Sequence, residues 1–152
     1  MKYQILVVDD DVAVRKVLQR VLAKAGYGVL EAANGAETLA VVAAEKVDLV
    51  LLDLNLPGEN GWDVFERLTT NRLPPPVIII TGRTDQLFPA QAAGVGALLE
   101  KPVDFPAMLQ AVSRLLAESP EARLARMTGR SADFIYTPSP DPDGRTPAPS
   151  AG

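Results

Sequence analysis

Five polar side chains that could perform chemistry together stand at the ends of short aliphatic runs. They are Asp9 and Asp10 after residues 5–8, Asp53 after residues 47–52, Thr81 after residues 77–80, and Lys101 just beyond residues 97–99. Three carboxylates brought into one crevice repel one another, and a hard divalent cation held by oxygen ligands is the usual remedy. These residue types therefore predict a Mg²⁺ site, in which the cation and Lys101 balance the three negative charges.

Such a site is suited to receive a phosphoryl group. Mg²⁺ and the Lys101 ammonium would neutralise the phosphoryl oxygens, and the Thr81 hydroxyl would offer a hydrogen-bond donor. The Asp53 carboxylate could then attack phosphorus in line and form an acyl phosphate. The predicted chemistry is the phosphorylation of a carboxylate.

These side chains need a scaffold that brings strand ends together, and the hydropathy pattern predicts one. Aliphatic runs at residues 5–8, 27–31, 47–52, 77–80 and 97–99 alternate with segments of helical period, which is typical of βα units. Strands that are apolar at nearly every position are covered on both faces, so we expect an α/β fold with a parallel sheet between two helical layers. Ligands of such sheets bind outside the carboxyl ends of the strands.

A helix is expected after each strand, and three polar residues are placed to begin helices. Asp11, Asn34 and Asp104 each stand just before an apolar pattern of helical period and have the short polar side chain of an N-cap. We therefore interpret Asp11 as a cap rather than a ligand. The fourth helix, at residues 89–93, is expected to be short.

Composition excludes several classes of function. The 152 residues contain no cysteine and no histidine, so the chain has no disulfide, no thiolate or imidazole metal ligand and no histidine nucleophile. A net charge of −4 argues against a general nucleic-acid-binding surface. Aliphatic runs fall short of the ~18 residues of a membrane helix, and the N-terminus lacks the features of a signal peptide. We expect a cytoplasmic protein that binds neither nucleic acid nor membranes.

Four segments together resemble the receiver domain of two-component response regulators. They are ILVVDDD, VLLDLNLPGENG, VIIITG and EKP, which follow one another in family-like order and spacing within residues 3–117. The resemblance implies a doubly wound, flavodoxin-like (βα)5 fold with five parallel strands in the order 2-1-3-4-5. It also implies a cis peptide bond between Lys101 and Pro102.

The same resemblance implies a role for each site residue. Asp53 is similar to the phosphoacceptor, Lys101 to the invariant lysine and Thr81 to the switch hydroxyl. Mg²⁺ would be held by the carboxylates of Asp9, Asp10 and Asp53, together with the backbone carbonyl of Asn55.

The function that the resemblance implies is phosphorelay signalling by a single-domain response regulator. A sensor histidine kinase or phosphotransfer protein would donate the phosphoryl group from phosphohistidine. The receiver would catalyse its own phosphorylation and slow autodephosphorylation without being an enzyme in the metabolic sense. It would act as a monomer or weak homodimer through phosphorylation-dependent contacts with a downstream protein.

Two alternatives from other classes remain open at this stage. A phosphohydrolase with an aspartyl-phosphate intermediate would use Asp9 and Asp11, which have the required spacing, but no cap insertion is evident. A degenerate receiver would bind partners independently of phosphorylation, although the intact acidic set argues against it.

Beyond the receiver domain at residues 1–118, two further segments are expected. Residues 119–136 form a C-terminal extension that either continues the last helix and packs on the domain or docks a partner. Residues 137–152 are rich in proline and have no large aliphatic side chain, which predicts a disordered tail.

Overall fold

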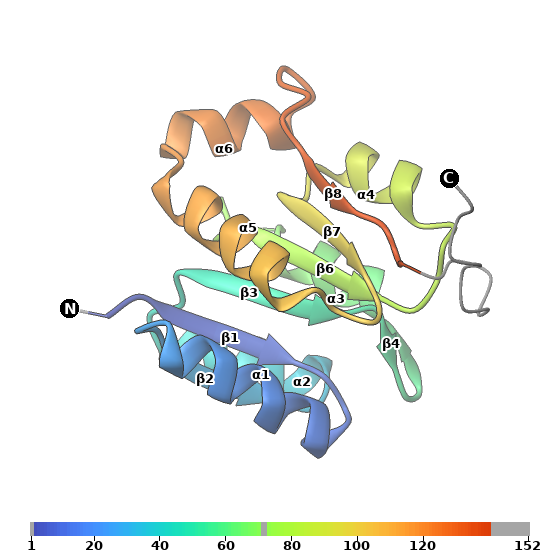
Figure 1. Cartoon of the computed structure of the whole chain (residues 1–152). Helices are drawn as coiled ribbons and strands as arrows, with labels where there is room; N and C mark the ends of the chain where they lie inside the picture. Colours follow the sequence, from blue (N-terminus) through green and yellow to red (C-terminus); the bar gives the residue numbers. More distant parts are fainter. Residues whose placement is uncertain (1, 71–72, 141–152) are drawn as a thin grey trace.

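The computed structural model of the chain describes residues 2–70 and 73–140, which form a three-layered α/β fold (Figure 1). The central sheet has the order β2-β1-β3-β6-β7-β8, and every neighbouring pair is parallel. Its strands are β1 (Gln4–Val8), β2 (Gly28–Ala32), β3 (Leu49–Asp53), β6 (Val77–Thr81), β7 (Ala97–Glu100) and β8 (Ile135–Thr137). The predicted order of the first five strands is confirmed.

The sixth strand, β8, departs from the predicted five-stranded sheet. It is three residues long and follows a segment without regular structure, so its sequence carries no alternation that would mark a strand. It exists because it pairs with the outer edge of β7.

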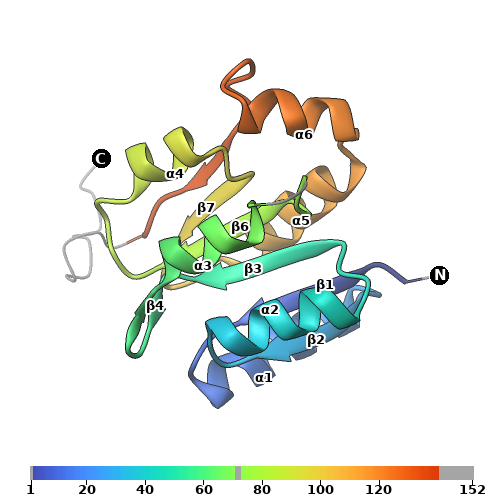
Figure 2. The same cartoon turned by 180° about the vertical axis from the view of Figure 1, so that it is seen from behind.

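Helices cover both faces of the sheet, as the two views show (Figures 1 and 2). Helices α1 (Val12–Lys24) and α5 (Phe105–Ala117) pack on one face, while α2 (Gly35–Ala44), α3 (Gly61–Leu68) and α4 (Leu87–Ala93) pack on the other. Helix α6 (Pro120–Met127) follows α5, and its Met127 packs against the hydrophobic cluster on the face covered by α2, α3 and α4. The short fourth helix is confirmed.

The expected helix caps are also confirmed. The side chains of Asp11, Asn34 and Asp104 accept hydrogen bonds from the backbone N–H groups of Ala13, Glu37 and Ala107. These bonds satisfy donors that the first turn of a helix leaves unpaired. They fix where α1, α2 and α5 start relative to the strand ends that precede them.

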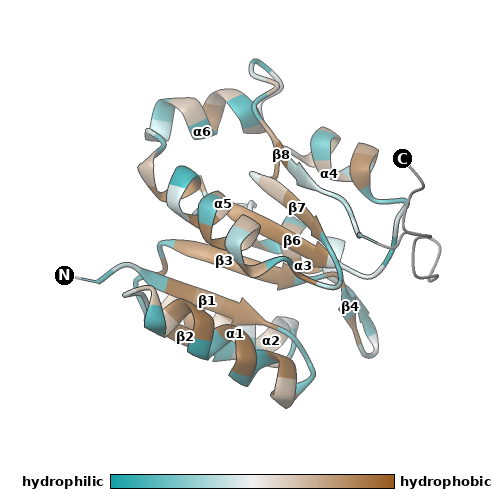
Figure 3. Ribbon diagram, in the orientation of Figure 1, coloured by the Kyte–Doolittle hydropathy of each residue, from teal (hydrophilic) through white to brown (hydrophobic). Residues whose placement is uncertain are grey.

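The core lies between the sheet and the helices that cover it, and the hydrophobic strands β1, β3 and β6 run through it (Figure 3). All residues of β3, β6 and β7 are buried, because helices cover both faces of these central strands. Successive side chains of a strand point to opposite faces, so Leu51 and Leu52 join different hydrophobic clusters. This rigid sheet carries the polar residues at its carboxyl edge.

A small antiparallel hairpin follows β3 and is formed by β4 (Asn55–Leu56) and β5 (Glu59–Asn60). Gly58 turns the chain with a φ of 71°, a backbone conformation that glycine adopts without strain. The hairpin places Asn55 directly beside the end of β3.

The C-terminal segments are ordered further than the predicted boundaries suggest. The extension predicted at residues 119–136 contains α6 and the start of β8, and β8 runs to Thr137, inside the predicted disordered tail. Ser139 is buried. The rest of that predicted tail, residues 141–152, lies outside the described residues. No helix in the described parts of the chain is long and apolar enough to cross a membrane.

Candidate functional site

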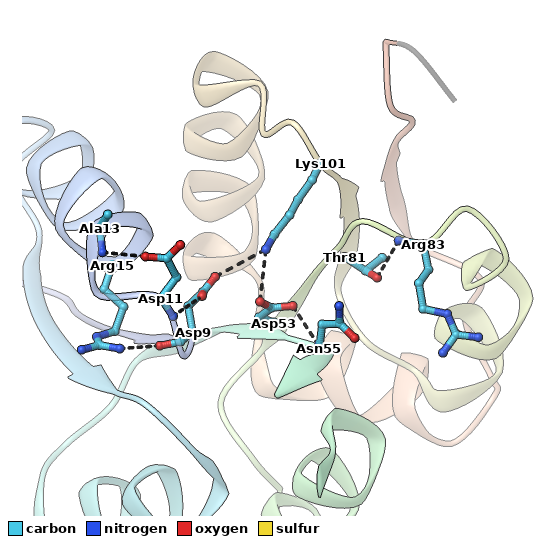
Figure 4. A network of polar contacts seen from close by, with 9 residues as sticks. All are labelled: Asp9, Asp11, Ala13, Arg15, Asp53, Asn55, Thr81, Arg83 and Lys101. Atoms are coloured by element: carbon cyan, nitrogen blue, oxygen red, sulfur yellow. Dashed lines mark hydrogen bonds and ion pairs between the residues drawn. The ribbon is translucent and has the colours of Figure 1, made fainter. Parts of the chain in front are cut away.

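Four of the five polar residues singled out in the sequence are seen to meet at the carboxyl edge of the sheet, namely Asp9, Asp53, Thr81 and Lys101 (Figure 4). Asp53 ends β3 and Thr81 ends β6, while Asp9 and Lys101 come directly after β1 and β7. The pairing of Asp53 with Ile80 aligns these strand ends, because all four strands run in the same direction. Sheet register therefore brings together residues that are far apart in sequence.

Lys101 lies between the two buried carboxylates. Its Nζ is 3.1 Å from Asp53 Oδ2 and 3.6 Å from Asp9 Oδ2. Both carboxylate side chains are 3% exposed, whereas the lysine side chain is 32% exposed. The Lys101 ammonium thus lies between solvent and the two buried carboxylates of Asp9 and Asp53.

Each buried carboxylate has its other oxygen held by the backbone two residues further along the chain. The N–H of Asp11 donates to Asp9 Oδ1 at 2.9 Å, and the N–H of Asn55 donates to Asp53 Oδ1 at 2.9 Å. The loops after β1 and β3 therefore fix both side chains in the same way, with Oδ2 of each facing Lys101.

The electrostatics of the cluster favour a further positive charge. Burial raises the pKa of Asp9, and the charge and hydrogen bond of Asp53 raise it further against the opposing effects of the Asp11 N–H and Lys101. For Lys101, burial is the largest single influence and acts to lower the pKa, but Asp53 and then Asp9 together outweigh it and raise the pKa. Lys101 therefore keeps its positive charge. That single charge does not balance the negative charges of the neighbouring carboxylates.

The residues present fit a divalent cation. Carboxylate oxygens of Asp9, Asp10 and Asp53 lie within 4.8 Å of one another, which suits a single ion. Asp10 is exposed, so the cluster opens to solvent on one side. Three carboxylates form the hard oxygen donor set that Mg²⁺ prefers, and Asn55 follows Asp53 closely enough in the chain to add its backbone carbonyl.

Thr81 and the loop after it form the other side of the site. The Thr81 side chain is fully buried, and its Oγ1 accepts a hydrogen bond from the Arg83 N–H at 3.0 Å. The Arg83 guanidinium turns away and pairs with Asp85 at 3.0 Å. The Lys101–Pro102 peptide bond is cis, as the resemblance implies.

Two supporting contacts were not predicted from the sequence. Arg15 Nη1 donates to the backbone carbonyl of Asp9 at 2.6 Å while its Nε pairs with Glu31. The Trp62 indole N–H donates to Gln86 Oε1 at 2.7 Å, joining α3 to the loop before α4. The sequence offered one signal for the Arg15 contact: this residue lies in the first turn of a helix, next to the acidic loop that precedes it.

An apolar groove borders the site next to Lys101. It has a volume of about 330 Å³ and lies between α1 and the chain that leads into α5. Its walls include Val14 and Val17 on one side and Pro102 and Phe105 on the other.

Comparisons with known proteins agree with this geometry. The sequence profile of the response regulator receiver domain matches residues 5–113. Sporulation initiation phosphotransferase F of Bacillus subtilis (strain 168) is 36% identical over 118 residues, which cover 76% of this chain and 95% of that protein. The DNA-binding transcriptional regulator NtrC of Rhizobium meliloti (strain 1021) is 35% identical over 131 residues. That match covers 85% of this chain but only 27% of NtrC, so the chain spans about a quarter of that relative's length.

Solved structures show the same fold. A CheY-like response regulator receiver domain protein from Methanospirillum hungatei JF-1 has a TM-score of 0.73 and 31% identity, over 80% of this chain and 98% of that one. The response regulator TrrA of Thermotoga maritima, in complex with Mg²⁺-BeF, has a TM-score of 0.69 and 29% identity, over 76% of this chain and 99% of that one.

Proposed function

The chain belongs to the response regulator receiver domain family, which serves phosphorylation-based signalling, and from that premise we propose that its Asp53 accepts a phosphoryl group. The observation that carries this proposal is the pairing of Asp53 with Lys101 at 3.1 Å inside a cluster of three carboxylates. A buried carboxylate held by the backbone on one side is a fixed nucleophile, and the adjacent ammonium can balance the charge of the incoming group.

The transfer is an in-line displacement at phosphorus. A carboxylate oxygen of Asp53 forms a bond to phosphorus while the bond between phosphorus and the donor's imidazole nitrogen breaks, and the electron pair of that bond stays on the imidazole. Lys101 remains protonated and stabilises the charge on the phosphoryl oxygens. The Thr81 hydroxyl, one strand away on β6, donates a hydrogen bond to one of those oxygens.

The acidic cluster would hold Mg²⁺ in this reaction. Asp9, Asp10 and Asp53 supply carboxylate oxygens, and the backbone carbonyl of Asn55 completes the protein's share of the ligands. When bound, Mg²⁺ neutralises phosphoryl oxygens and helps to keep the donor group in line with Asp53. The bonds from the Asp11 and Asn55 N–H groups hold the carboxylates ready for it.

The donor would be a sensor histidine kinase or a phosphotransfer protein, and the groove beside Lys101 supports this. A protein that presents phosphohistidine to Asp53 has to cover the surface around the site, and the apolar wall formed by α1 and Phe105 would be buried by it. Val17, which lines the groove, is 44% exposed, so this apolar wall faces solvent in the chain alone.

Signalling would then depend on contacts with another protein that change with the phosphorylation state. The chain would catalyse its own phosphorylation and a slow loss of the phosphoryl group. A receiver-like module that binds independently of phosphorylation is the second candidate, but the complete Asp9–Asp53–Lys101 arrangement favours the first.

The intact mass of the protein after incubation with a small acyl phosphate, with and without Mg²⁺, tests this proposal. A single Mg²⁺-dependent phosphoryl adduct is expected in the native chain and in Asp63→Asn, an exposed control in α3, but not in Asp53→Asn. Released phosphate is measured in parallel to detect rapid hydrolysis. Absence of both adduct and released phosphate from a folded native chain would contradict the proposal.

A further inference from the structure

A third buried carboxylate, Glu100, lies next to the site but takes no part in the proposed transfer. Its side chain is 3% exposed, although it directly precedes Lys101 at the end of β7. A buried carboxylate is stable only if its oxygens are hydrogen-bonded. Both partners of Glu100 come from the C-terminal part of the chain: Tyr136 Oη donates to Oε2 at 3.1 Å and the Ser139 N–H donates to Oε1 at 2.8 Å.

These donors belong to residues 134–139, which we call the C-terminal strap. The strap contains β8, whose residues Ile135, Tyr136 and Thr137 pair in parallel with Ala97, Leu98 and Leu99 of β7. The Ile135 N–H also donates to the Gly96 carbonyl at 3.1 Å, and Phe134 packs against the hydrophobic core. The strap therefore forms the edge of the sheet and is outside the receiver match at residues 5–113.

Helix α6 anchors the strap from its N-terminal side. Arg126 of α6 is buried, and its guanidinium pairs with both carboxylate oxygens of Glu118, one at 2.8 Å, while its Nε donates to the Gly94 carbonyl at 3.1 Å. Gly94 has a φ of 78°, and a Cβ at this position would lie 2.7 Å from the Cα of Met127. Close packing of α6 on the end of α4 thus requires glycine and fixes where the strap starts.

Glu100 connects the strap to the phosphoacceptor site through the backbone. Glu100 pairs with Thr81 in the sheet, and the N–H of the next residue, Lys101, donates to the Thr81 carbonyl at 2.8 Å. Adjacent side chains of a strand point to opposite faces, so the side chains of Glu100 and Lys101 leave the backbone in opposite directions. The strap binds Glu100 on one side, and Lys101 extends toward Asp53 on the other. Without its two donors, the Glu100 carboxylate would have to move toward water and would displace this strand end.

We propose that the C-terminal strap positions Lys101 for phosphoryl transfer to Asp53, with Glu100 and Tyr136 as the positioning residues. The proposal rests on the proposed function of Asp53. Burial and the neighbouring Glu100 carboxylate raise the pKa of the Tyr136 hydroxyl, so it is a hydrogen-bond donor at neutral pH.

Tyr136→Phe in the full chain tests the proposal, because it removes one oxygen and leaves the ring in place. Tyr136 is 39% exposed, and Tyr3→Phe, at a site that is 51% exposed, is the matched control. With Mg²⁺ and an acyl phosphate, Tyr136→Phe is expected to lower the rate of adduct formation at saturating donor by about fivefold, the scale of one lost hydrogen bond of ordinary strength. The donor concentration for half-maximal rate and the Tyr3→Phe rate should not change.

Repeating the Tyr136→Phe substitution in a Glu100→Gln variant shows whether Tyr136 acts through Glu100. In Glu100→Gln the carboxylate charge is lost, so the further effect of Tyr136→Phe should be smaller than in the native chain. Equal effects in both backgrounds would show that Tyr136 acts by another route and would overturn the proposal.

Amide hydrogen exchange supplies a readout that needs neither Mg²⁺ nor donor. The Lys101 N–H, bonded to the Thr81 carbonyl, should exchange about fivefold faster in Tyr136→Phe, as expected for loosening by one such bond. The Val50 N–H, bonded to the Pro76 carbonyl at 3.0 Å where β3 pairs with β6, is the internal control and should be unchanged. Faster exchange at both positions would indicate a general loss of stability and would overturn the positioning role of the strap.

The outcomes separate this inference from the proposed function. If the native chain forms the adduct at Asp53 and Tyr136→Phe forms it at the same rate, the strap is only structural and the inference fails. A change in the half-maximal donor concentration alone would also overturn it, because positioning of Lys101 acts on the transfer step. If the native chain forms no adduct and releases no phosphate, the proposed function fails and the inference fails with it.

Discussion

Asp9→Asn should stabilise the protein without metal, because Asp9 is a buried carboxylate beside a second one, Asp53. At an effective dielectric constant of about 20, its attraction to Lys101 at 3.6 Å is worth about 4–5 kcal/mol. Repulsion from Asp53, with oxygens of the cluster inside 4.8 Å, is worth about 3–4 kcal/mol at the same dielectric constant. The two nearly cancel, so the cost of burial decides the sign, in agreement with the raised pKa of Asp9.

Neutralising Asp9 removes that burial cost and keeps an oxygen for the Asp11 N–H. We expect metal-free Asp9→Asn to be more stable than the native chain by about 1–2 kcal/mol, since burying an amide costs less than burying a charge. For a chain of this size that corresponds to a rise of roughly 3–6 °C in Tm. Thermal unfolding in a chelator measures it.

Mg²⁺ should reverse the order of stability. At one hundred times its dissociation constant, the ion stabilises the native chain by about 2.7 kcal/mol, which exceeds the metal-free advantage of Asp9→Asn, while the variant lacks one of the proposed charged ligands and should gain little. Asp11→Asn is the matched control, because asparagine caps a helix as well as aspartate and Asp11 caps α1. This control should respond to Mg²⁺ as the native chain does.

The pH dependence of the metal-free proteins follows from the raised pKa of Asp9. At neutral pH the folded native chain is destabilised by the cost of burying the Asp9 charge. That cost disappears as the pH falls through the raised pKa of Asp9 and the carboxylate is protonated. The advantage of Asp9→Asn should therefore shrink toward acid pH. A lower Tm of metal-free Asp9→Asn than of the native chain at neutral pH would contradict this prediction, because it would mean that Lys101 more than compensates for the buried charge.

Three further substitutions test other parts of the account. Lys101→Met should slow adduct formation by about 100-fold, the cost of removing one preorganised electrostatic donor, while stabilisation by Mg²⁺ persists in thermal unfolding. Thr81→Val, which keeps the buried shape but removes the hydroxyl, should slow the same reaction by about tenfold in a mass-spectrometric time course. Arg126→Met should lower the free energy of unfolding in urea by about 3 kcal/mol, since it leaves Glu118 without its buried partner, whereas the exposed Arg130→Met should change it by less than about 0.5 kcal/mol.

Local chemistry made much of the fold predictable from the sequence. Asp11, Asn34 and Asp104 cap helices as expected, because an N-cap depends on residues within one turn. Continuous aliphatic runs identified the buried parallel strands, with boundaries that shift by about one or two residues. The grouping of Asp9, Asp53, Thr81 and Lys101 followed from one rule, that parallel strands end at the same edge.

The contacts that were not predicted depend on tertiary structure. Strand β8 is too short to show a period, and its position follows from the free edge of β7. Arg126 pairs with Glu118 eight residues earlier and across a helix break, a separation that no helical pairing rule predicts. Glu100 reads in sequence as an ordinary strand end, and only its Tyr136 and Ser139 partners show why it is buried.

The decisive experiment identifies the residue that carries the phosphoryl group. The protein is incubated with Mg²⁺ and a small acyl phosphate as donor. The aspartyl phosphate formed on the protein is then reduced with borohydride, and the digested peptides are sequenced by mass spectrometry. Reduction converts a phosphorylated aspartate into the corresponding alcohol, homoserine, and leaves free carboxylates unchanged. Homoserine at position 53, with unchanged aspartate at positions 9 and 10, is the predicted result. Homoserine at position 9 or 10 with unmodified Asp53 would contradict the account.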